Sequence, residues 1–170
     1  SGASGDRYAH MAIYPYPGHL IQEWPMNAGK LVTIRPIRPA DAEMEQEFVK
    51  AMSDESRYYR FMDTLRELTQ TMLVRFTQID YDREMALVAT VPGAESKEIQ
   101  IGVARYVVNP DGESVEFALA VGDDWQKCGV GRKLMTALID CARQKGYRAV
   151  VGDVLSTNSK MFRLMTSLGF

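Results

Sequence analysis

The sequence lacks the features that several classes of protein require. It has no run of about 18 apolar residues, which a membrane-spanning helix needs, and no charged-then-apolar start typical of a signal peptide. Its formal net charge is only −2 and its pI is near 5.7, so it has no broad basic field for nucleic acid. We therefore expect a cytoplasmic protein that binds neither membranes nor nucleic acid.

Potential metal ligands are equally scarce. The only cysteines, Cys128 and Cys141, form neither a close pair nor a Cys/His cluster with zinc spacing, which predicts free thiols and no metal site. What the chain does contain is ordinary: 46% hydrophobic and 25% charged residues over 170 positions are typical of one globular domain with a single core.

The first thirty residues are predicted to be a tether, that is, a linker that joins this domain to a preceding one. Residues 1–5 are small and flexible, and they are interpreted as a cloning remnant or the end of an interdomain linker. In residues 8–27, three prolines, Pro15, Pro17 and Pro25, favour an extended backbone. We assign residues 1–30 to a linker and residues 31–170 to the folded domain.

Apolar periodicity in the domain alternates between the periods of strands and helices. It predicts strands at 31–38, 84–91, 98–109, 114–121 and a buried strand at 149–155, with Pro36 placing the first near an edge or bulge. It predicts helices at 40–52, 54–62, 69–79, 129–145 and 158–168. Strands 84–91 and 98–109 should form an antiparallel hairpin, within a mixed α/β sandwich.

Residues 126–131 lie between a predicted strand and a long helix, where backbone N–H groups and a helix N-terminus face an anion. Gly129 and Gly131 let the backbone approach a pyrophosphate closely, and Lys127, Arg132 and Lys133 add positive charge. The alternative is a tight helix entry with a solvated basic face. The strand-loop-helix context favours phosphate.

The Gln-x-x-Gly-x-Gly pattern of this loop resembles the acyl-CoA pyrophosphate motif of the GNAT superfamily of N-acetyltransferases. The order of elements from residue 31 to residue 170, Asn158 and the final Leu168, Gly169 and Phe170 strengthen the resemblance. The segments 56–61, 116–118 and 123–126 are similar to the GNAT domain of bacterial Pat-type protein lysine acetyltransferases.

This resemblance implies an α/β (α+β) GNAT fold, in which a mixed, mostly antiparallel sheet flanked by helices splays open at the acyl-CoA site. It implies acetyl-CoA as cofactor, a protein lysine as acceptor with acyl-CoA synthetases as candidate targets, and an upstream acyl-CoA-synthetase-like or nucleotide-binding domain. GNAT chains normally continue into a final strand after the position of Phe170, so we expect that the given sequence lacks this strand and that the acceptor side is less ordered without it. Arg57, Tyr58 and Arg60 are candidates for partner contact, although Tyr58, Tyr59 and Phe61 could equally be core aromatics.

Glu116 is the candidate general base. Strand alternation places it on a face otherwise lined by small residues, about 17 Å along the strand from Val121, which suits a pantetheine arm. Transfer to lysine needs a neutral amine, yet the free side chain has a pKa near 10.4, so a base is required. We expect Glu116 to be partly buried; the alternative is a structural carboxylate paired with an arginine such as Arg105.

The remaining site residues follow from the motif and the resemblance. Asn158 would contact the pantetheine amides, cap the helix after it, or do both. Met165 stands where many GNAT enzymes carry a tyrosine acid, and it cannot donate a proton. A nucleophilic role for Cys128 is disfavoured because direct transfer needs no covalent enzyme intermediate, and Cys141 reads as core. The expected cofactor-binding residues are Leu119, Ala120, Val121, Gln126, Lys127, Cys128, Gly129, Val130, Gly131, Arg132, Lys133 and Asn158.

Two other functions stay open at this point. A small-amine acetyltransferase would use the same cofactor half of the site, because that half does not specify the acceptor. A non-catalytic acyl-CoA sensor that controls an attached domain would need the phosphate loop but not the base.

Overall fold

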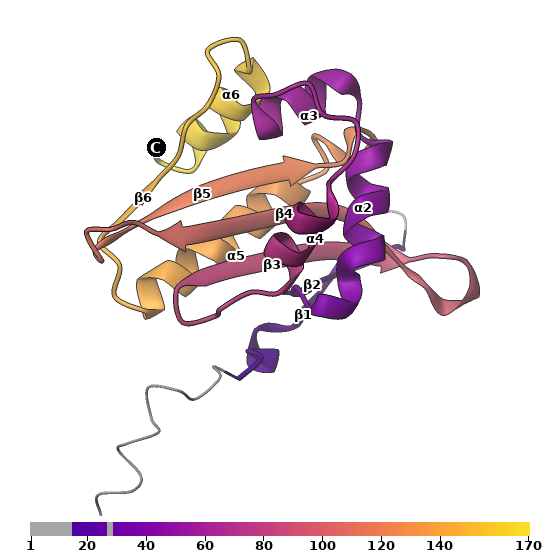
Figure 1. The fold of residues 1–170 in the computed structure, drawn as a ribbon, viewed down its shortest axis with the longest axis horizontal. Helices are drawn as coiled ribbons and strands as arrows, with labels where there is room; N and C mark the ends of the chain where they lie inside the picture. Colours follow the sequence, from indigo (N-terminus) through magenta and orange to yellow (C-terminus); the bar gives the residue numbers. More distant parts are fainter. Residues whose placement is uncertain (1–14, 27–28) are drawn as a thin grey trace, which may run out of the picture.

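The computed structural model describes residues 15–26 and 29–170 and contains one six-stranded sheet whose strands follow each other in sequence order (Figure 1). Neighbouring strands from β1 to β5 are antiparallel, whereas β5 and β6 are parallel, so the sheet is mixed. The strands are β1 (Gln22–Pro25), β2 (Leu31–Pro36), β3 (Glu84–Pro92), β4 (Glu98–Val108), β5 (Ser114–Val121) and β6 (Ala149–Val151).

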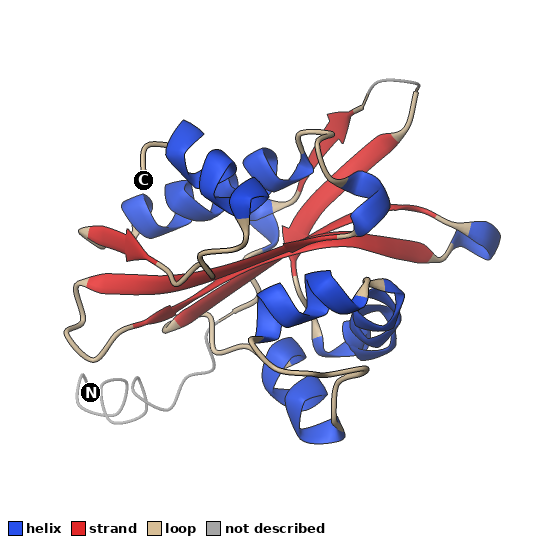
Figure 2. Cartoon of the chain, turned by 90° about the horizontal axis from the view of Figure 1, so that it is seen from above, coloured by secondary structure: helices blue, strands red, loops and turns tan. Residues whose placement is uncertain are grey.

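Helices cover both faces of this twisted sheet, which Figure 2 shows from above. On one face, α5 (Val130–Gln144) and α6 (Ser159–Ser167) pack over a core that β3, β4 and β5 share. On the other face, α2 (Ala42–Ala51), α3 (Asp54–Phe61) and α4 (Gln70–Thr77) cover a second core. Short 3₁₀ turns occur at Gly18–Leu20, Pro39–Asp41, Ala94–Ser96 and Asp123–Trp125.

Local sequence explains where these helices begin and end. Ser53 and Thr69 each accept a hydrogen bond from a backbone N–H of the first turn and so cap α3 and α4. On α5, Val130, Leu134, Leu138 and Cys141 recur at helical spacing, and all of them are buried. The helix predictions for the chain are therefore confirmed to within a few residues at each end.

Three strand predictions need correction. Residues 22–25, expected to be tether, form β1, which pairs with β2 and makes β2 an interior strand rather than an edge. Pro36 is tolerated because it is the last residue of β2, beyond the stretch that β1 pairs. The last strand is shorter than expected and is not buried: β6 spans three residues, two of them exposed, since it pairs only with β5.

A buried ion pair joins β2 to the turn before α2. The Arg35 guanidinium donates to both carboxylate oxygens of Asp41, each at 2.8 Å, and Glu98 from β4 accepts a further bond. Burial alone would raise the pKa of Asp41, yet these hydrogen bonds and the positive charge of Arg35 hold it below its ordinary value. Asp41 therefore stays ionised in the folded protein at mildly acidic pH.

This ion pair predicts acid-dependent stability. Because the folded-state pKa of Asp41 lies below its unfolded value of about 3.9, its contribution is present above that pH and is lost as pH falls through the folded pKa. Asp41→Asn should cost about 3 kcal/mol at pH 7, because it leaves Arg35 with less compensation, and should flatten the fall in stability below about pH 4. Urea unfolding at pH 7 and pH 3 measures both effects; parallel pH curves for the two proteins would contradict the assignment.

Candidate functional site

β5 and β6 separate after only three residue pairs. Glu116 and Val151 form the last pair, and Phe117 to Val121 keep their β4 partners without a β6 partner on the other edge. Gly152 follows β6 directly against the Phe117 ring, and an added Cβ there would lie 2.4 Å from a ring carbon. The Phe117 ring thus fills the space that a side chain at position 152 would need, and beyond Glu116 one edge of β5 is left open.

At the far end of this open edge, the chain turns through Asp123–Trp125 into a loop and then into α5. Gly129 has φ +86°, a left-handed conformation that suits glycine, and its carbonyl accepts the hydrogen bond of Lys133 N–H at 3.0 Å. The first N–H groups of α5 have no partner within the helix, and the helix dipole adds positive potential. The structure thus has the helix entry that the sequence predicts, and the binding of an anion there stays a prediction.

A pocket of about 510 Å³ extends from this loop along the open edge of β5. Its walls come from α3, β5, the loop, α5 and α6, which lie far apart in the sequence. It contains five cationic side chains and no carboxylate. Among the described residues no group of three or more His, Cys, Asp or Glu could hold a metal ion. The lining residues are Ser56, Tyr59, Arg60, Leu119, Val121, Trp125, Gln126, Lys127, Gly129, Gly131, Arg132, Asn158, Lys160, Met161, Arg163 and Leu164.

Most of the predicted cofactor-binding residues line this pocket: Leu119, Val121, Gln126, Lys127, Gly129, Gly131, Arg132 and Asn158. Four others lie outside its walls. Ala120 is buried in the core under α2 and α4, and Val130, the first residue of α5, is buried in the core between that helix and the sheet. Cys128 is exposed beside the Gln126 carbonyl, and the Lys133 ammonium lies 5.7 Å from the centre of the Trp24 ring.

Glu116 lies at the point where β5 and β6 separate, but its environment differs from the expectation. The residue is exposed rather than partly buried, and it lies outside the pocket walls. The alternative partner, Arg105, forms its ion pair with the buried Glu45, at 3.7 Å. An exposed carboxylate at the mouth of the splay is open to a large acceptor.

Side chains of α3 and α6 form the pocket wall opposite β5. The Tyr59 hydroxyl donates to the Thr157 carbonyl at 3.2 Å, and the Lys160 ammonium donates to the Gln126 amide oxygen at 3.4 Å. Asn158 both lines the pocket and accepts the Met161 N–H at 3.3 Å, so it caps α6. Asn158 thus caps the helix, as expected, and it also lies where it could contact the pantetheine amides.

The structure also locates four further residues that the sequence analysis named. Met165 is buried in the core, as is Cys141, whose thiol pKa is raised by burial. Arg57 is not available for partner contact, because it is buried and donates to carbonyl groups at the end of α2. Tyr58 is exposed.

The sequence pattern missed several pocket residues. Ser56, Tyr59 and Arg60 belong to α3, and Lys160, Met161 and Arg163 belong to α6. Nothing in their local sequence points to the loop at 126–131, since only the packing of the helices brings them together. Trp24 was also missed: the tether strand β1 places its ring beside Gly129, where an added Cβ would lie 3.4 Å from it.

Comparison with known proteins identifies the family of this chain. The family described as acetyltransferase (GNAT) domain matches residues 32–170. An acetyltransferase of Pseudomonas aeruginosa is 34% identical over 85% of this chain and 77% of its own length. The acetyltransferase Pat of Mycolicibacterium smegmatis is 32% identical over 85% of this chain, which spans only 42% of that protein. The crystal structure of the GNAT domain of S. lividans PAT matches with a TM-score of 0.81 at 29% identity, covering 91% of this chain and 90% of that one.

Proposed function

Because this chain belongs to the GNAT family of acetyltransferases, which use acetyl-CoA, we propose that it transfers acetyl from acetyl-CoA to the side-chain amine of a protein lysine. The observation that carries the proposal is the open edge of β5, with the phosphate loop at one end and Glu116 at the other. The similarity to proteins named Pat supports a protein acceptor.

The pocket fits acetyl-CoA in charge and shape. Lys127 and Arg132 from the loop and α5, and Lys160 and Arg163 from α6, would hold the phosphates together with the N–H groups at the start of α5. Gly131 lines the pocket, and a Cβ there would approach Leu164 to 3.1 Å, so the glycine keeps the passage open. The unpaired edge of β5 offers backbone groups to the amides of the pantetheine arm.

Acetyl-CoA supplies an activated thioester, so the remaining task of the protein is to orient the acceptor and to remove a proton from it. Glu116 takes this proton, directly or through a water molecule, because lysine is mostly protonated at neutral pH. Its exposure lets a lysine on another protein reach it. Met165 cannot act as the acid because it is a buried thioether, so solvent reprotonates the departing thiolate.

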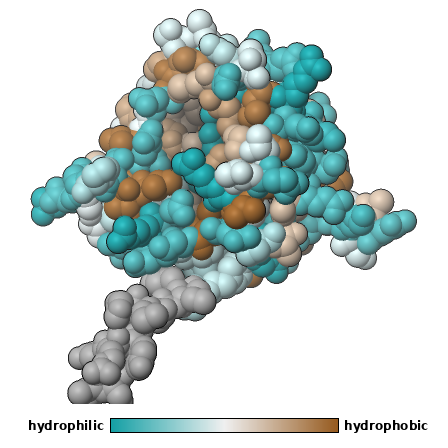
Figure 3. All heavy atoms as spheres, viewed as in Figure 1, coloured by the Kyte–Doolittle hydropathy of each residue, from teal (hydrophilic) through white to brown (hydrophobic). Residues whose placement is uncertain are grey.

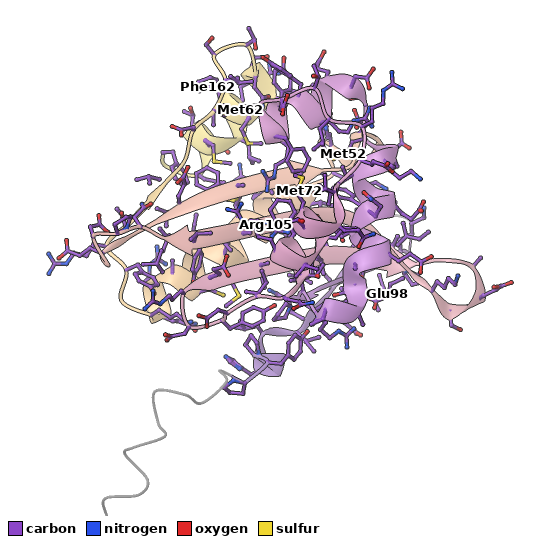
Figure 4. The ribbon with its side chains drawn as sticks, viewed as in Figure 1. Met52, Met62, Met72, Glu98, Arg105 and Phe162 are labelled. Atoms are coloured by element: carbon purple, nitrogen blue, oxygen red, sulfur yellow. The ribbon has the colours of Figure 1, made fainter. Side chains whose placement is uncertain are left out.

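The acceptor approaches from the side of α3 and α6. In the space-filling view of Figure 3, apolar residues gather around a hollow in the upper part of the face, where Figure 1 places these two helices. Met62 and Phe162, labelled in Figure 4, are 46% and 45% exposed. An apolar rim around a charged pocket is suited to a protein acceptor.

The proposal extends to the rest of the protein. We propose that an upstream domain, acyl-CoA-synthetase-like or nucleotide-binding, is joined to this one through the residues before β1, since this chain spans less than half of the curated Pat protein it matches. No helix within residues 15–26 and 29–170 is long and apolar enough to cross a membrane. We place the reaction in a bacterial cytoplasm, where acetyl-CoA and acyl-CoA synthetases occur together.

An acetyl-transfer assay tests the acceptor. The purified protein is incubated with acetyl-CoA and either acyl-CoA synthetases or polyamines, and mass spectrometry records the products. We expect acetyl-lysine on the synthetases at a rate well above that of the uncatalysed reaction, and no product from polyamines. Acetylated polyamines alone would favour the small-amine enzyme. Acetyl-CoA binding without any transfer would favour the acyl-CoA sensor.

A further inference from the structure

Two arginine side chains lie near the same phenylalanine ring on the face of the sheet that α2 and α4 cover. Arg105, labelled in Figure 4, projects from β4, and its Cζ lies 4.5 Å from the centre of the Phe76 ring. Arg60 comes from α3, with its Cζ 4.7 Å from the Phe61 ring centre and 5.8 Å from that of Phe76. The two cations therefore share one aromatic neighbour.

The two positive charges share one buried carboxylate, that of Glu45. Glu45 is buried, ion-paired with Arg105 at 3.7 Å and hydrogen-bonded by Gln100 at 2.7 Å. Within the described part of the chain, Arg60 has no ion-pair partner of its own. Burial, followed by the charge of Arg105, lowers the pKa of Arg60 to about 10 against the opposing effect of Glu45, so Arg60 is still charged at neutral pH. A half-buried cation without an ion-pair partner favours an anionic ligand.

Arg60 also faces the pocket, from a different wall than the other cations. Lys127, Arg132, Lys160 and Arg163 belong to the loop, α5 and α6, whereas Arg60 is the pocket cation on α3. The phosphates proposed for the loop account for the first four, but Arg60 requires a separate explanation.

The position of Arg60 along α3 indicates what this side chain could bind. The start of this helix is fixed near the phosphate loop, because Asp123 accepts hydrogen bonds from Ser53 N–H at 3.1 Å and Ser56 Oγ at 3.0 Å. Arg60 lies four residues beyond Ser56, or about 6 Å along the helix. Its neighbour Arg105 pairs with Ala118, two residues from Glu116 on the same face of β5. Arg60 is therefore near the reacting end of the pocket.

We propose that Arg60 binds a carboxylate of the substrate close to the reacting groups, an inference that rests on the acyl transfer proposed above. The carboxylate belongs either to the acceptor, beside its reactive amine, or to the distal end of a dicarboxylic acyl group on CoA. A guanidinium is suited to this role because its planar fork donates two parallel hydrogen bonds to a carboxylate. The carboxylate balances the positive charge of Arg60, which is half-buried at the pocket wall.

The donor arm of the test measures binding alone. Calorimetry compares succinyl-CoA with butyryl-CoA, which has a neutral chain of the same length, for the wild type, Arg60→Gln and Arg60→Lys. If the carboxylate comes from the acyl group, Arg60→Gln weakens succinyl-CoA binding by about tenfold to a hundredfold and leaves butyryl-CoA unchanged. Arg60→Lys restores part of the preference. Arg66→Gln, at an exposed position outside the pocket, is the matched control.

The acceptor arm measures kcat/KM with acetyl-CoA and two peptides, in which the acceptor lysine is followed by glutamate or by glutamine. If the carboxylate comes from the acceptor, Arg60→Gln lowers kcat/KM by a similar factor for the glutamate peptide only. Thermal melts establish that each variant is folded. Should Arg60→Gln fail to fold, the preference of the wild type within each pair decides, and no preference in either pair overturns the proposal.

The remaining outcomes separate the two proposals. Equal losses for both members of each pair, or no loss in either arm, overturn the carboxylate subsite and leave the acetyl transfer standing. Selective loss of succinyl-CoA binding in a protein that acetylates no acceptor supports the subsite and contradicts the proposed function.

Discussion

Gly131→Val is expected to lower acetyl-CoA affinity by about a hundredfold or more while the protein remains folded. A Cβ at this position would lie 3.1 Å from Leu164 and 3.4 Å from Val121, and the two added methyl groups would extend into the pocket beside the start of α5. The helix N–H groups and the cations remain, but the phosphates can no longer approach them closely. A hundredfold loss corresponds to about 2.7 kcal/mol.

Calorimetric titration with acetyl-CoA measures this loss. Thr136→Val is the matched control, since it introduces the same residue into α5 at an exposed position outside the pocket, and its affinity should equal that of the wild type. Some loss of stability from crowding against Leu164 is expected in Gly131→Val, on the order of 1–3 kcal/mol. If a folded Gly131→Val protein bound acetyl-CoA with wild-type affinity, this result would contradict the placement of the cofactor at this loop.

Glu116→Gln is expected to separate binding from chemistry. Acetyl-CoA affinity should stay unchanged, because Glu116 lies outside the pocket walls, whereas kcat at neutral pH should fall by about a hundredfold or more from the loss of a general base. The defect should shrink as pH approaches the pKa of the acceptor lysine, near 10.4, since the amine then loses its proton without help.

The matched control for this prediction is Glu113→Gln, which makes the same change at an exposed position just before β5. A pH series of kcat for the three proteins shows whether the defect depends on the protonation of the acceptor. A Glu116→Gln enzyme with wild-type turnover at every pH would reduce Glu116 to a surface carboxylate.

The phosphate loop and the motif strand illustrate what could be predicted from local sequence. β5 has the predicted bounds, Ser114–Val121, because its alternation is strict and turns flank it. The pattern at residues 126–131 predicted a helix entry open to an anion, and the structure places Gly129, Gly131, Lys127 and Arg132 at the pocket. These features depend on backbone conformation and side-chain period within one short segment.

The errors have a common cause. β1 was missed because four residues ending in proline carry little strand signal of their own, and they become a strand only when β2 provides hydrogen-bond partners. The exposure of Glu116 could not be judged either, because it depends on where β6 turns away around Phe117 and Gly152.

The sequence by itself determined the order of strands and helices from β2 onward, the apolar faces that join them, the loop at 126–131 and the resemblance to the GNAT family, because each is encoded within a stretch of local pattern. Only the tertiary structure decided which side chains share a pocket. Arg60 of α3 and Leu119 of β5, 59 positions apart in the chain, line the same pocket because α3 packs against that strand. Such proximity results from long-range packing, in which each helix buries its apolar face wherever the sheet provides a complementary surface.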